Sequence, residues 1–175
     1  MADLLVVVDM QNDFISGSLG TPEAQAIVEN VKRKIADYAS KGNPIIFTQD
    51  THEADYLKTR EGKYLPVEHC IKGTWGWQIP EDIDVSRAEH YRKDRFAYDR
   101  WIFDDFSFAD AGIESIEVIG LCTDICVISN VFALQMEFPE FDFIVDASCC
   151  AGVTPEKHKA ALEVMKSCQI EVINE

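Results

Sequence analysis

The chain has 175 residues, of which 47% are hydrophobic and 27% are charged, and this length predicts one domain, residues 1–175, with a sizeable core. Acidic residues outnumber basic residues by 31 to 16, and the formal net charge is −15. The surface field therefore repels phosphate backbones and anionic lipid headgroups, so we expect neither nucleic acid nor a membrane among the partners.

The N-terminal residues and the cysteines favour a cytoplasmic protein. The first residues lack the basic segment of a signal peptide, and an acid already follows at Asp9. The longest apolar stretch, residues 116–136, carries Glu117 and Asp124, which make a membrane-spanning helix costly. Six cysteines without a secretion signal are expected to be free thiols, most of them small buried side chains.

The first half of the chain alternates apolar runs with amphipathic segments. Residues 4–8 are a continuous leucine and valine run that ends at Asp9, as is typical of a strand buried on both faces. A Thr-Pro-Glu sequence then opens a helix over residues 21–41, which a glycine closes. A second apolar run, residues 44–49, predicts a strand that ends at Asp50.

The middle of the chain is less regular. Residues 51–84 show little periodicity and contain several glycines and prolines, which predicts a long loop with one short helix at most. Loops of this length inside a compact domain are usually functional. A third strand is expected at 88–92, a helix at 101–111 and a fourth strand at 115–121.

The last third repeats the same alternation. A helix is expected at 123–136, a strand at 141–145 that ends at Asp146, a helix at 154–168 and a strand at 170–173. Alternating strands and helices imply an α/β fold, a three-layer α/β/α sandwich around a six-stranded parallel sheet. Such sheets bind ligands at the carboxyl ends of the strands, where the strand order reverses.

Reactive side chains follow five of the predicted strands. They are Asp9, Asp50, His52, Lys93, Cys122, Cys126 and Asp146. In a Rossmann-like strand order of 3-2-1-4-5-6, the first and fourth strands are neighbours and Asp9 meets Cys126. We assign no chemistry to Asp146, which is expected in a turn after its strand.

The three residues Asp9, Lys93 and Cys126 form a constellation suited to acyl transfer. A cysteine is mostly protonated at neutral pH and needs activation to act as a nucleophile. Cys126 is expected in the first turn of a helix, where the helix dipole favours an anion. Asp9 could accept the thiol proton, and Lys93 would keep Asp9 ionised and offset the charge that develops during the reaction.

These residues lie in motifs that resemble the isochorismatase-like cysteine hydrolases. The motifs are residues 6–14 (VVVDMQNDF), Lys93 after the third strand, and residues 120–127 (GLCTDICV). The resemblance implies that Asp9, Lys93 and Cys126 are the catalytic triad and that the strand order is 3-2-1-4-5-6. It also implies a cis peptide bond between Leu121 and Cys122, which would aim the Cys122 N–H beside that of Cys126 as an oxyanion hole.

Motifs at the start of and within the predicted loop, residues 51–84, narrow the family resemblance to one branch, the nicotinamidases. Residues 48–52 (TQDTH) and 65–74 (LPVEHCIKGT) resemble the nicotinamidase metal site, which implies the ligands Asp50, His52 and His69. Oxygen and nitrogen ligands with open positions suit Zn²⁺, Mn²⁺ or Fe²⁺, and zinc is the favoured metal. Glu61 is the nearest match to a further ligand, although it is offset by one residue.

Aromatic side chains are candidates for the substrate pocket. Phe14 matches the phenylalanine that stacks on the substrate ring in the family. The family's second aromatic residue is displaced here, where Pro66 stands. Trp75 is our candidate to replace it, with Tyr64 and Trp77 as alternatives.

The function expected from these motifs is hydrolysis of a small carboxamide, with nicotinamide to nicotinate and ammonia as the favoured reaction. The alternatives are a metal-free amidase for another small amide and a non-catalytic binding or regulatory protein. A vinyl-ether hydrolase of the isochorismatase kind does not use a cysteine nucleophile, so Cys126 disfavours it. Phosphoryl-transfer folds typically carry a second acid where Gln11 stands. The family commonly assembles, so a homo-oligomer is expected.

Overall fold

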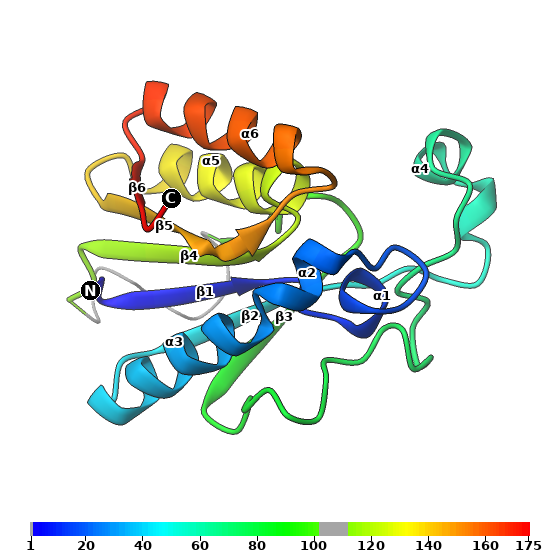
Figure 1. The fold of residues 1–175 in the computed structure, drawn as a ribbon, viewed down its shortest axis with the longest axis horizontal. Coiled ribbons are helices and arrows are strands. Elements are labelled where there is room, and N and C mark those ends of the chain that lie inside the picture. Colours follow the sequence, from blue (N-terminus) through cyan, green and yellow to red (C-terminus); the bar gives the residue numbers. More distant parts are fainter. Residues whose placement is uncertain (1, 102–111) are drawn as a thin grey trace.

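The computed structural model describes residues 2–101 and 112–175, and its centre is a parallel sheet of six strands (Figure 1). The strands lie in the order β3-β2-β1-β4-β5-β6, as expected. Their bounds are β1 Leu4–Val8, β2 Ile45–Asp50, β3 Ala88–Lys93, β4 Ser115–Leu121, β5 Asp142–Ala151 and β6 Glu171–Ile173. The order reverses between β1 and β4, which places the switch point beside Asp9.

Helices cover both faces of the sheet (Figure 1). Helices α2 and α3 lie on one face, and α5 and α6 lie on the other. Every residue of β1 is fully buried, because this strand lies between two others and beneath both helix layers. This burial explains the uninterrupted apolar run in the sequence. Among the described residues, none of the helices has the length and apolar character that crossing a membrane requires.

The helix expected over residues 21–41 is divided in two. Helix α2 spans Pro22–Ala26 and α3 spans Val28–Lys41, with Ile27 between them. The start is as predicted, since the Thr21 hydroxyl accepts a hydrogen bond from the Ala24 N–H. The end is also as predicted, because Gly42 adopts a φ of 76°, a left-handed conformation that glycine adopts at little cost. A short helix not expected from the sequence, α1 (Asn12–Ile15), follows Asp9.

The long loop after β2 contains two short helices. These are a 3₁₀ helix at Tyr56–Lys58 and α4 at Arg60–Tyr64, where one was expected. Helix α4 projects away from the sheet at the end where the strands β1 and β2 terminate (Figure 1). The helix expected at 101–111 lies outside the described residues, apart from Trp101.

Strand β5 differs from the expectation. It continues to Ala151, so Asp146 lies within the strand and not in a turn after it. Asp146 is 2% exposed, its carboxylate lies 2.8 Å from the Lys34 ammonium, and its backbone pairs with β6. The buried ion pair allows an acidic residue inside a strand, and for this reason the polar residue was a poor marker of the strand end.

A register shift between Val118 and Gly120 accompanies the longer β5. Gly120 has a φ of 120°, and a Cβ atom there would lie 2.1 Å from the Val8 carbonyl oxygen. Only glycine allows β4 to approach β1 so closely at the point where the two strands end. The segment after β4 begins as a π-helix, Thr123–Val127, and continues as α5 (Ile128–Glu137), where one α-helix was expected.

Candidate active site

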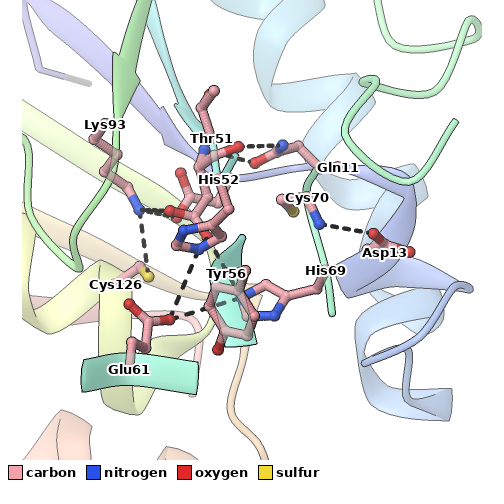
Figure 2. A network of polar contacts seen from close by, with 12 residues as sticks. Gln11, Asp13, Thr51, His52, Tyr56, Glu61, His69, Cys70, Lys93 and Cys126 are labelled. Atoms are coloured by element: carbon pink, nitrogen blue, oxygen red, sulfur yellow. Dashed lines mark hydrogen bonds and ion pairs between the residues drawn. The ribbon is translucent and has the colours of Figure 1, made fainter. Parts of the chain in front are cut away.

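Asp9, Lys93 and Cys126 meet at the switch point. The Lys93 ammonium lies 2.6 Å from Asp9 Oδ2 and 3.6 Å from Cys126 Sγ. All three residues are at most 5% exposed. Because β3 and β4 are separated by two strands, the long Lys93 side chain reaches across the sheet end to make these contacts (Figure 2).

Asp9 has an unusual backbone conformation for a residue with a side chain. Its φ is 49°, in the left-handed region that L-residues rarely adopt and that often marks functional positions. Its carboxylate accepts a 2.7 Å hydrogen bond from the Thr48 hydroxyl through Oδ1. Burial raises the pKa of Asp9 against the opposing effect of the Lys93 ammonium, which makes Asp9 a stronger base than an exposed aspartate.

Lys93 is the last residue of β3, and its cationic form is stabilised by the surrounding anions. Burial lowers its pKa, but the negative charges of Asp9 and Asp50 outweigh that effect and hold the pKa well above the usual value. Lys93 is therefore a permanent positive charge in the site.

Cys126 lies in the π-helix after β4, and its thiol is buried. We expected the helix start to favour a thiolate, but burial raises the pKa of Cys126 well above its usual value, although Lys93 opposes the effect. The resting side chain is therefore a thiol, which needs a base to become a nucleophile. The Leu121–Cys122 peptide bond before it is cis, at the position that the family resemblance implied.

A second cluster of potential ligands lies beside these three residues. Oxygen and nitrogen atoms of Asp50, His52 and His69 all lie within 4.8 Å of one another. His52 Nε2 is 2.9 Å and His69 Nε2 is 3.6 Å from Asp50 Oδ2. Glu61 Oε1 faces both histidines, at 3.7 and 3.8 Å (Figure 2). The structure thus brings together all four residues for which the sequence suggested metal binding.

The donor atoms of this cluster fit a divalent metal. His69 Nδ1 lies 2.8 Å from the Val67 carbonyl oxygen, which can only accept, so Nδ1 carries the proton and Nε2 presents a lone pair to the cluster. Burial by itself would raise the pKa of Asp50. The Lys93 charge and the His52 hydrogen bond have a larger, opposite effect and hold this pKa well below its usual range. Asp50 is therefore a carboxylate, as metal binding requires.

Two polar residues of the first motif that we had not singled out support this cluster. The Gln11 side chain receives a hydrogen bond from the Asp50 N–H and donates one to the Asp50 carbonyl oxygen, at 2.8 and 2.9 Å. Asp13 accepts a 2.8 Å hydrogen bond from the N–H of Cys70, the residue after His69. Their presence two and four residues after Asp9 was the available signal, because Gln11 at the start of α1 and Asp13 within it both bond the segments that carry the metal ligands.

A cavity of about 340 Å³ opens beside the thiol. Its lining is mostly apolar and includes Phe14, Tyr64, Leu121, Cys122, Ile125 and Cys126, with Asp50, Glu61 and His69 at the metal cluster. Trp75 does not line the cavity and is 59% exposed. The structure thus places Trp75, our candidate from the sequence, outside the lining of this cavity, to which the short α4 contributes Tyr64. Trp77 is also absent from the lining.

The chain is similar in sequence to known proteins. Residues 3–175 match the family model for the isochorismatase domain. The chain is 27% identical to the nicotinamidase/pyrazinamidase of Mycobacterium tuberculosis, with 97% of each chain covered. It is 28% identical to a probable inactive nicotinamidase of Arabidopsis thaliana, with 93% of this chain and 87% of the relative covered.

Solved structures show the same fold. The pyrazinamidase of Pyrococcus horikoshii, determined in complex with zinc, is 26% identical, with a TM-score of 0.81 and 98% of each chain covered. The N-carbamoylsarcosine amidase of Thermoplasma acidophilum is also 26% identical, with a TM-score of 0.82 and coverage of 98% of this chain and 95% of that one.

Proposed function

The chain belongs to the isochorismatase family, and we propose that it is a nicotinamidase, which hydrolyses nicotinamide to nicotinate and ammonia. Its similarity to nicotinamidases and to another amidase supports an enzyme that acts on small amides. The observation that carries the proposal is the convergence of Asp9, Lys93 and Cys126 at the wall of a small apolar cavity, next to a cluster of metal-binding side chains.

Asp9 is the general base in this proposal and Cys126 is the nucleophile. Asp9 takes the thiol proton, and the sulfur attacks the carboxamide carbon of the substrate. The raised pKa values of both groups fit this exchange, because a buried carboxylate is a better acceptor for the proton of a buried thiol. Lys93 remains positive and offsets the negative charge that moves from Asp9 to the sulfur.

The backbone N–H groups of Cys122 and Cys126 are our candidates for the oxyanion hole. Each such donor typically contributes about 3 to 4 kcal/mol to transition-state stabilisation. Asp9 then gives its proton to the departing ammonia, which leaves a thioester on Cys126. In the second half of the reaction Asp9 activates a water molecule, which hydrolyses the thioester and releases the carboxylic acid.

Asp50, His52, His69 and Glu61 would hold a divalent metal, for which we propose zinc. The bound metal would supply a Lewis acid beside the substrate. The remaining contacts are made by the protein. Phe14, which is 8% exposed, lines the cavity and would stack on the aromatic ring of the substrate, and Tyr64 is a second aromatic residue of the lining.

Two other functions remain as alternatives. The structural similarity to N-carbamoylsarcosine amidase favours a different small amide as the substrate. One relative is described as a probable inactive nicotinamidase, which favours a non-catalytic protein on this fold. The intact group of acid, lysine and thiol in this chain supports catalysis over the second alternative.

Ammonia release from nicotinamide tests the proposal. We expect turnover by the metal-loaded protein, loss of turnover in Cys126→Ala with an unchanged circular dichroism spectrum, and normal turnover in Cys168→Ala, which removes an exposed thiol. Undiminished turnover in Cys126→Ala would contradict the mechanism. Release of ammonia from other small amides but not from nicotinamide would support the first alternative, and release from none would support the second.

A further inference from the structure

Asn130 is a buried polar residue that the mechanism above does not use. It lies in the first turn of α5, four residues after Cys126, and is 0% exposed. Asparagine is a mediocre helix former, and a buried amide must find partners for its donors and its acceptor. A leucine or an alanine at this buried helix position would need no hydrogen-bond partners. The partners of the Asn130 amide therefore explain why an asparagine is found here.

The Asn130 amide joins two separate segments of the chain. Its nitrogen donates hydrogen bonds to the carbonyl oxygen of Cys126, at 2.8 Å, and to that of Phe96, at 3.2 Å. Its oxygen accepts a 3.0 Å hydrogen bond from the Tyr98 N–H. Asn130 thus connects the backbone of the nucleophile to the segment that follows Lys93.

The sheet itself does not fix the distance between Lys93 and Cys126. Lys93 ends β3 and Cys126 follows β4, and the order β3-β2-β1-β4 separates these strands by two others. Three strand spacings amount to about 14 Å. The contact of 3.6 Å between the Lys93 ammonium and Cys126 Sγ therefore depends on the segments beyond the strand ends, which Asn130 ties together.

Phe96 is also part of this arrangement. Its side chain lines the cavity beside the thiol, and its carbonyl oxygen is one of the two that Asn130 binds. The Asn130 side chain is therefore hydrogen-bonded both to the backbone of the nucleophile and to that of a residue in the cavity wall. The ion-paired group of Lys34, Glu117 and Asp146, by contrast, contributes no residue to the lining of the cavity.

We propose that Asn130 is a positioning residue, which holds the Cys126 sulfur against the Lys93 ammonium and fixes the cavity wall at Phe96. This inference rests on the proposed function, because it concerns the geometry of the proposed nucleophile. It adds a residue that touches neither the substrate nor the reacting atoms and acts through the backbone of two segments.

Two variants test the role of the amide. Asn130→Ala removes all three hydrogen bonds and adds no charge, while Asn130→Asp keeps the acceptor for Tyr98 and loses the donors to Cys126 and Phe96. We expect both variants to retain the wild-type circular dichroism spectrum and bound metal. Their kcat for ammonia release should fall at least tenfold, with a smaller change in KM.

The decisive readout is alkylation of Cys126 by iodoacetamide, followed across pH by mass spectrometry of the Cys126 peptide. Displacement of the sulfur from Lys93 should move the midpoint of this profile to higher pH and slow the reaction at least threefold at pH 8. Because alkylation needs no substrate, the result stands even if nicotinamide is not hydrolysed, so failure of this inference and failure of the proposed function are distinguishable.

Asn30→Ala is the matched control. Asn30 also donates a side-chain hydrogen bond to a backbone carbonyl, that of Ser148 at 2.7 Å, but Ser148, unlike Cys126 and Phe96, does not line the cavity beside the thiol. This variant should keep the wild-type kcat and alkylation profile. A purely structural role for Asn130 would lower stability and leave the alkylation profile of the folded variants unchanged, and that outcome would overturn the proposal. Failure of both Asn130 variants to fold would also overturn it.

Discussion

Lys93 and Asp50 are in direct contact, with 3.3 Å between the ammonium nitrogen and Asp50 Oδ1. The other oxygen of the same carboxylate, Oδ2, faces His52 and His69. Asp50 therefore belongs to both halves of the site, the one that holds the thiol and the one that could hold a metal. Lys93 in turn balances two buried carboxylates, since it also contacts Asp9.

The first prediction follows from this balance of charges. Lys93→Met would leave Asp9 and Asp50 buried without their cation, and loss of one partner from a buried ion pair typically costs about 3 to 5 kcal/mol. We expect a loss of this size in the free energy of unfolding, measured by urea denaturation, together with loss of ammonia release. Lys72→Met is the control, because its exposed ion pair with Glu53 spans 3.8 Å and should contribute less than about 1 kcal/mol. Equal stability of the two variants would contradict the prediction.

The second prediction concerns the metal. Treatment with a chelator should abolish ammonia release, and Zn²⁺, Mn²⁺ or Fe²⁺ should restore it. His69→Ala should reduce the metal content measured by plasma mass spectrometry after dialysis against zinc, because it removes one of the three buried ligands. His90→Ala is the control, since His90 stacks on Phe47 at a centroid distance of 5.7 Å and is outside the cluster. Full activity of a protein that takes up no metal would rule out the metal site.

The third prediction separates two aromatic residues. Phe14→Leu keeps most of the buried volume but removes the ring that lines the cavity. Aromatic stacking contributes about 0.5 to 1.5 kcal/mol, so KM for nicotinamide should rise about 2- to 13-fold with a smaller effect on kcat. Trp75→Leu should leave both constants unchanged, because Trp75 is exposed and lies outside the cavity lining. A larger effect from Trp75→Leu than from Phe14→Leu would place the substrate elsewhere.

The fourth prediction tests the close approach of β4 to β1. Gly120→Ala would place a Cβ atom 2.1 Å from the Val8 carbonyl oxygen, and the strands would have to separate beside Asp9. We expect a loss of about 3 kcal/mol in the free energy of unfolding and a loss of activity. Gly42→Ala also has a positive φ but meets no atom within 4 Å, so it should cost about 1 kcal/mol and leave kcat unchanged. Urea denaturation and ammonia release compare the two.

Local sequence patterns predicted most elements of the fold. The buried run of β1 and the Thr-Pro start of α2 depend on neighbouring residues and on burial periodicity, so they can be recognised in a single sequence. The end of β5 could not be recognised, because Asp146 continues the strand through an ion pair with Lys34, a residue more than 100 positions earlier. A polar residue signals a turn only when no distant partner compensates its charge.

The candidate site divides in the same way. The residue types of the site and their places at the ends of strands could be predicted from the sequence, because motifs and apolar runs are local. The contacts could not be predicted in this way and are known from the folded chain: Asp50 joins Lys93 to the histidines, Tyr64 and not Trp75 lines the cavity, and burial keeps Cys126 protonated. These features depend on how the loop after β2 folds back and on how deeply each group is buried. Both result from packing between segments that are distant in the sequence.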